Sequence, residues 1–84
     1  MSKFKVPPTH KGCKKIFSAI EERIEKIECF PRGSLVRLYM KTGQEIDVFP
    51  HEDKYSVAVW KGDNRTVVLE KVDDQYGLKR YLDT

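Results

Sequence analysis

The sequence lacks any long run of apolar residues, and this limits where the protein can work. No apolar stretch approaches the roughly 20 residues that a membrane-spanning helix needs. The first residues, which include Pro7 and Pro8, contain no apolar segment like the core of a secretion signal. We therefore expect a cytoplasmic protein with no membrane partner.

Cysteine is scarce, and its two positions predict neither a disulfide nor a metal site. Cys13 and Cys29 fall in one predicted helix, where roughly 24 Å would separate them along the axis. A disulfide needs α-carbons within about 7 Å, so we expect free thiols in a reducing compartment. With His10 and His51 they stand at no recognised zinc spacing. We expect no metal and no cofactor.

Motifs for catalysis are also missing. The chain has no glycine-rich phosphate loop and no nucleophile beside an identifiable base. The acidic pairs Glu52-Asp53 and Asp73-Asp74 fall in predicted turns, where carboxylates are solvated and no burial raises their pKa. The sequence therefore predicts a protein that is not an enzyme.

Charge is modest in total but uneven along the chain. The 84 residues carry a formal net charge of +3, yet the first 15 residues hold five lysines and no acid. These lysines are Lys3, Lys5, Lys11, Lys14 and Lys15. We interpret residues 1–10 as a basic arm that precedes a single domain over residues 11–84. Such an arm suits nucleic acid or another polyanion, and a merely solvated terminus is the alternative.

Apolar residues recur with a helical period between residues 11 and 29. They occupy a stripe roughly 100° wide and comprise Cys13, Ile16, Phe17, Ile20, Ile24 and Ile27. Pro31 ends the segment, because proline disfavours helical geometry in the preceding residue. We predict an amphipathic helix over residues 11–29.

After Gly33 the apolar period changes to two, which is typical of strands. We predict strands at about 34–41, 44–49, 55–61 and 66–72, and a short last element at 78–82 that is a closing strand rather than a helical turn. A three-residue turn, Lys41-Thr42-Gly43, keeps one hairpin face apolar and places Arg37 opposite Asp47. The fold class is α+β. The helix packs across a four- to five-stranded antiparallel sheet, or the sheet curls into a small barrel capped by the helix.

Aromatic and basic side chains alternate with the apolar ones in these strands. Tyr39 and Phe49 fall on the polar face beside Arg37, and Trp60 precedes Lys61. Such a mixture can stack bases and neutralise phosphates. The alternative is that a bent sheet partly buries these aromatics for structural reasons.

The first hairpin resembles that of the Sm-like small-barrel proteins, which include Sm and Lsm proteins and the bacterial host-factor RNA chaperone. The matching residues are Val36, Leu38, Met40, Thr42, Gly43 and Ile46, and more roughly Asp53-Lys54-Tyr55-Ser56-Val57. The second strand departs from the pattern because it lacks the family's glycine, and Ser56 replaces a frequent asparagine. The resemblance implies an Sm-like or SH3-like barrel, a homo-oligomeric ring and RNA binding.

Together these features predict a small non-catalytic regulatory binding protein. One hypothesis is RNA binding through the five lysines, Arg37, Tyr39, Trp60 and Lys61. Another is a protein-binding regulator or inhibitor of a host or phage (mobile-element) process, which would present a sheet edge or the charged helix face. A structural module without either activity is the third.

Overall fold

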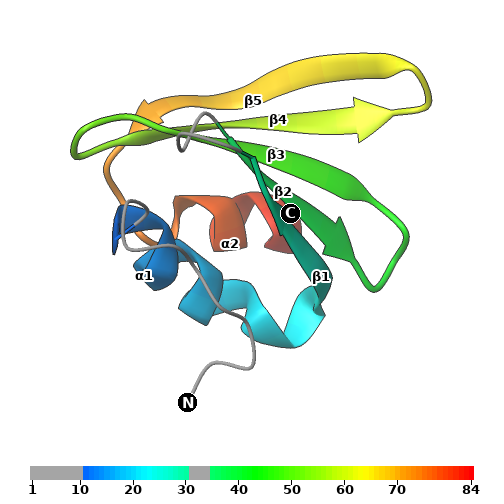
Figure 1. Ribbon diagram of the computed structural model, residues 1–84, viewed down its shortest axis with the longest axis horizontal. Coiled ribbons are helices and arrows are strands. Elements are labelled where there is room, and N and C mark those ends of the chain that lie inside the picture. Colours follow the sequence, from blue (N-terminus) through cyan, green and yellow to red (C-terminus); the bar gives the residue numbers. More distant parts are fainter. Residues whose placement is uncertain (1–10, 31–34) are drawn as a thin grey trace.

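The computed structural model describes residues 11–30 and 35–84, with side chains from residue 16 onward. This part of the chain forms an α+β fold of two short helices and one antiparallel sheet (Figure 1). The elements are α1 (Lys11–Ile20), the 3₁₀ turn η2 (Glu21–Arg23), β1 (Ile24–Cys29), β2 (Val36–Met40), β3 (Glu45–Pro50), β4 (Tyr55–Lys61), β5 (Asn64–Val72) and α2 (Gly77–Asp83).

The five strands follow one another across the sheet in the order β1-β2-β3-β4-β5, each antiparallel to its neighbours. Among the described residues, β1 pairs only with β2 and β5 only with β4, so the sheet is open. A closed barrel would require β1 to pair with β5, and the described residues show no such pairing, so the closed-barrel alternative is wrong for them. The hairpin register predicted from the turn is confirmed, since Leu38 pairs with Ile46 and Arg37 with Asp47. Gly43 in that turn has a φ of 91°, which glycine adopts without strain.

The helix predicted over residues 11–29 is wrong in its second half. The α-helix ends at Ile20, and Ile24–Cys29 form β1. The register of β1 against β2 shifts between Ile24 and Lys26, so that Ile24 pairs with Met40 and Ile27 with Leu38. This bulge puts two residues three apart on the same side of the sheet, and the resulting spacing imitates a helical period.

The last element is also corrected, because residues 77–83 form α2 and not a closing strand. Leu78 is fully buried, and Tyr81 and Leu82 pack partly buried against the core. Their spacing of three and four is that of one helix face. The segment contributes a helix to the core and does not extend the sheet.

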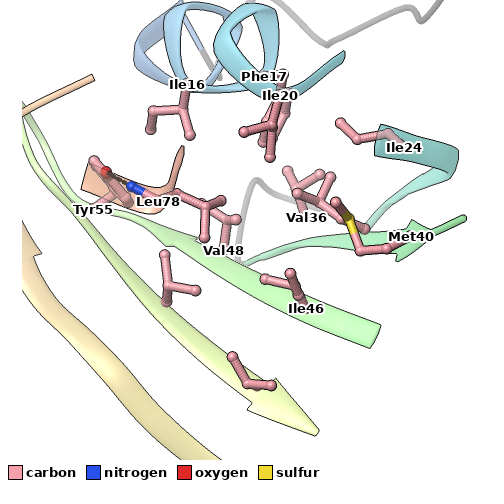
Figure 2. Close-up of a cluster of buried hydrophobic side chains, with 13 residues drawn as sticks. Ile16, Phe17, Ile20, Ile24, Val36, Met40, Ile46, Val48, Tyr55 and Leu78 are labelled. Atoms are coloured by element: carbon pink, nitrogen blue, oxygen red, sulfur yellow. Dashed lines mark hydrogen bonds between the residues drawn. The ribbon is translucent and has the colours of Figure 1, made fainter. Parts of the chain in front are cut away.

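Both helices lie beside the same face of the curved sheet, and the core fills the space between (Figures 1 and 2). The buried cluster comprises Ile16, Phe17 and Ile20 from α1, Leu78 from α2, and Ile24, Val36, Leu38, Met40, Ile46, Val48, Tyr55, Val57 and Val59 from the strands. In β2 and β3 these residues alternate with side chains on the opposite face, as pleated strands require. The two faces of the sheet therefore have different chemistry.

The hydroxyl of Tyr55 ties α2 to the sheet. It donates to the carbonyl oxygen of Asp74 at 2.8 Å and accepts the amide of Leu78 at 3.1 Å. The first residue of α2, Gly77, lies so close that an added β-carbon would stand 2.8 Å from this oxygen. The same β-carbon would stand 3.2 Å from Val72 Cγ1, so the position has no room for a larger residue unless these neighbours move.

We expect Gly77→Ala and Tyr55→Phe each to destabilise the fold and to be non-additive. Loss of the Tyr55 hydroxyl leaves a buried amide unpaired, which costs about 1–3 kcal/mol. The same loss removes the nearest atom that a β-carbon at position 77 would meet and leaves only Val72 Cγ1, at 3.2 Å, in tight contact. Gly77→Ala should therefore cost less in the Tyr55→Phe background. Urea denaturation of the four proteins tests this, with the exposed Tyr76→Phe as a control of unchanged stability. Additive costs would contradict the contact.

Candidate functional site

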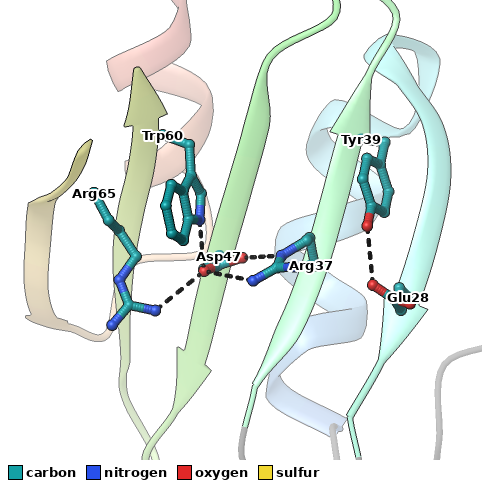
Figure 3. A network of polar contacts seen from close by, with 6 residues as sticks. All are labelled: Glu28, Arg37, Tyr39, Asp47, Trp60 and Arg65. Carbon is teal, nitrogen blue, oxygen red and sulfur yellow. Dashed lines mark hydrogen bonds and ion pairs between the residues drawn. The ribbon is translucent and has the colours of Figure 1, made fainter. Parts of the chain in front are cut away.

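The sheet face opposite the core, which we call the outer face, carries polar and aromatic side chains, six of which are drawn in Figure 3. All five strands contribute to it. Its residues alternate with core residues along the strands and pair with one another across neighbouring strands. The outer face includes Lys26 and Glu28 of β1, Phe30 just after it, Arg37 and Tyr39 of β2, Glu45, Asp47 and Phe49 of β3, Ser56, Ala58 and Trp60 of β4, and Arg65 and the exposed Val67 of β5.

The centre of the outer face is the carboxylate of Asp47, which is fully buried. Arg37 donates to it through Nε at 2.8 Å (Oδ1) and Nη2 at 3.4 Å (Oδ2). Trp60 Nε1 donates to Oδ2 at 2.9 Å, and Arg65 Nη1 reaches the same oxygen at 3.4 Å. Side chains from β2, β4 and β5 thus converge on one acid of β3, as a buried charge requires.

This convergence sets the ionisation of the group. Burial alone raises the pKa of Asp47, but the hydrogen bonds from Arg37, Trp60 and Arg65 outweigh burial and hold this pKa below its ordinary value. The hydrogen bond to Asp47 in turn raises the pKa of Arg37. The carboxylate and its arginine are therefore both charged at neutral pH.

The two guanidinium groups also lie next to aromatic rings. The Arg37 guanidinium carbon is 5.1 Å from the ring centre of Phe30 and 5.8 Å from that of Trp60. Arg65 is 5.3 Å from the ring centre of Phe49 and 5.6 Å from that of Trp60. These distances are those of cation–π contacts. Arginine and aromatic groups thus alternate across the outer face.

A second, smaller contact set lies between β1 and β2. The Tyr39 hydroxyl donates to Glu28 Oε1 at 2.9 Å, and Lys26 Nζ lies 5.4 Å from the Tyr39 ring centre. The hydrogen bond to Glu28 raises the pKa of Tyr39, so this phenol is neutral at physiological pH. The Tyr39 ring is half-buried and retains accessible surface.

The structure brings together three of the predicted site residues, namely Arg37, Tyr39 and Trp60 (Figure 3). Lys61 is exposed at the end of β4, where strand alternation directs it to the face opposite Trp60. The lysines at 11, 14 and 15 belong to α1, but their side chains lie outside the described part, as do both lysines of the arm. Their predicted role is unchanged.

Sequence reasoning missed Arg65 and Phe30, and it treated Asp47 only as a partner of Arg37. One signal could have found Arg65, because a two-residue turn at Gly62-Asp63 pairs Trp60 with Arg65. No local signal predicts the contact of Phe30 with Arg37, because β1 ends at Cys29 and strand alternation no longer fixes the direction of the next side chain.

Away from the centre of the outer face, His51 Nε2 lies 2.9 Å from the Ser56 hydroxyl, which also accepts the Lys71 amide at 3.0 Å. The register of β5 shifts at this point, and Lys71 has a φ of 50°. The Ser56 hydroxyl thus satisfies an amide at the irregularity, as a bulge requires. We therefore interpret the contact between His51 and Ser56 as structural, because it lies where β5 changes register.

The structure places one of the two cysteines and shows no metal-binding cluster in the described part of the chain. Cys29 is a free, exposed thiol on β1 and not on a helix, so the axial distance used for the disulfide argument does not apply to it. Over residues 11–30 and 35–84, no group of three or more His, Cys, Asp or Glu is placed to hold a metal ion. None of the helices in the same ranges is both long and apolar enough to cross a membrane.

Comparison of the chain with protein-family models, with curated proteins and with solved structures finds no match. The resemblance to Sm-like proteins therefore stays a prediction.

We expect Asp47→Asn to lower the free energy of unfolding at pH 7 by about 1–3 kcal/mol, because the amide cannot pair with both arginines. A carboxyl whose pKa is lowered by folding stabilises above its unfolded pKa of about 4, and this contribution disappears as the pH falls through the folded pKa. The gap between Asp47→Asn and the wild type should therefore narrow below about pH 4. Urea denaturation across pH measures it, and a gap of constant size would contradict the pairing. Asp53→Asn, in an exposed loop, is the matched control.

Proposed function

We propose that this protein binds single-stranded nucleic acid, with RNA as the expected form, through the outer face of its sheet. The observation that carries the proposal is the alternation of aromatic rings and guanidinium groups over adjacent strands, centred on Trp60. An open sheet face of this kind offers several planar groups at neighbouring positions. Unpaired bases stack on such groups regardless of sequence, since every base has a π-face.

The arginines can serve a nucleic acid in a second way. Arg65 is 43% exposed and uses Nη1 on Asp47, which leaves its other nitrogen donors for a phosphate or a base edge. Arg37 is 22% exposed and is held by two hydrogen bonds. A guanidinium fork of this type suits phosphate oxygens.

The lysines near the start of the chain complete the proposal. Five lysines and no acid occur in the first 15 residues, and the chain has a net charge of +3. Contacts between lysine and phosphate release counterions, so they make affinity depend on salt. We assign base stacking to the outer face and most of the phosphate binding to these lysines.

The outer face also suits a second reading, since tyrosine, tryptophan and arginine dominate protein-binding hot spots. A regulator that binds a protein through the same surface is therefore the competing function. The two are distinguished by what changes the environment of Trp60.

Trp60 is the single tryptophan of the chain, so its fluorescence reports on the outer face alone. We expect a mixed-sequence RNA of about 10 nucleotides, within the site size of single-strand binders, to quench this fluorescence at low salt. Tyr39→Ala removes one stacking group and should weaken binding by about 1–3 kcal/mol. The matched control is Tyr76→Ala, because Tyr76 is exposed next to α2 and away from the outer face.

The proposal fails if the RNA neither quenches Trp60 nor binds by an independent measurement at low salt. Equal weakening by Tyr39→Ala and Tyr76→Ala would remove the outer face from the site. A purified protein partner that shifts Trp60 emission after nuclease treatment would favour the competing function.

A further inference from the structure

The outer face has almost no net charge, although it is rich in arginine. Its cations are Lys26, Arg37 and Arg65, and its acids are Glu28, Glu45 and Asp47. Surfaces that bind nucleic acid through phosphates carry a clear excess of positive charge. The outer face has the planar groups of a nucleic-acid site without that excess.

We propose that Asp47 determines the ligand class of the outer face, making it select unpaired bases over double-stranded nucleic acid. The inference rests on the proposed function and deepens it. Asp47 is fully buried, so it touches no ligand and acts as a positioning residue. It works through Arg37, Arg65 and Trp60, the three side chains that donate to it.

The first effect of Asp47 is geometric. Two hydrogen bonds fix the orientation of the Arg37 guanidinium, because the fork matches a carboxylate. Arg65, from the far edge of the sheet, is drawn across β4 towards Asp47, where it also meets Phe49 and Trp60. The β4 residue that pairs with Asp47 is Ala58, whose small side chain leaves this space open. The groups that stack are therefore ordered before any ligand arrives.

The second effect is electrostatic. The carboxylate offsets one of the two arginine charges, so the outer face attracts phosphates weakly. A duplex hides the faces of its bases and presents mainly phosphates, which gives it few contacts here. A single strand offers the bases themselves, and these bind through stacking that does not need net charge. The lysines near the start of the chain serve both forms equally, and the selection comes from the outer face.

The test uses Asp47→Asn with a mixed-sequence RNA of about 10 nucleotides, free and annealed to its complement. We expect the ratio of single-strand to duplex affinity to fall about tenfold, the equivalent of one lost stacking contact. Duplex affinity should rise, and its log–log salt dependence should steepen by about 0.9, because one more positive charge becomes available. A purely structural role for Asp47 would lower both affinities together.

A second variant keeps the test decisive if Asp47→Asn fails to fold. Arg65→Lys changes an exposed side chain, keeps its charge and removes its planar group. We expect weaker binding of the single strand with unchanged duplex affinity and salt dependence. The matched control for Asp47→Asn is Glu52→Gln, which removes one acid from an exposed loop outside the outer face. This control should leave the affinity ratio at the wild-type value.

The outcomes separate the two proposals. Wild-type protein that binds neither RNA form overturns the proposed function, and the inference falls with it. Wild-type protein that binds both forms equally overturns only the inference. The same is true if Glu52→Gln reproduces the effect of Asp47→Asn, since charge anywhere would then suffice, or if Arg65→Lys weakens both forms alike.

Discussion

Over the described residues, both helices lie on one side of the sheet, so the sheet's own side chains form its other surface. Here α1 and α2 contribute to the core on one side, and the opposite side holds arginines, aromatic rings and a buried carboxylate. Asp47 makes that arrangement possible, because its carboxylate pairs with both arginines and holds their side chains against the sheet. Without an acid at the centre, two arginines side by side would repel each other and extend into solvent.

Buried ion pairs are costly to desolvate and add little to stability compared with apolar packing of equal volume. Val or Leu at position 47 and apolar partners could cover the same area without charge. The chain instead commits a fully buried acid, two arginines and an indole nitrogen to one cluster. What this cluster supplies is orientation of planar groups at a surface that remains partly accessible, and orientation is what a binding site needs.

The sequence predicted the hairpin and its register well, for reasons that are local. Leu38 and Ile46 could share a face with their apolar neighbours only through the three-residue turn, which also placed Arg37 opposite Asp47. The same reasoning failed at residues 24–29, where a bulge replaced the period of two with a spacing of three. It failed again at residues 77–83. Leu78, Tyr81 and Leu82 have helical spacing, but the segment is too short for this spacing to distinguish a helix from a strand.

What the sequence alone determined is the alternation along β2 and β3, the turn between these two strands, and the occurrence of basic and aromatic residues next to one another around Arg37, Tyr39 and Trp60. These follow from neighbours a few residues apart. Only the tertiary structure decided that Arg65 and Trp60 meet Asp47, and that the strand β1 begins where a helix was expected. The contacts of Asp47 with Trp60 and Arg65 join three strands, so they depend on the order of the strands in the sheet. The start of β1 depends on the position of a bulge, and no local period encodes either feature.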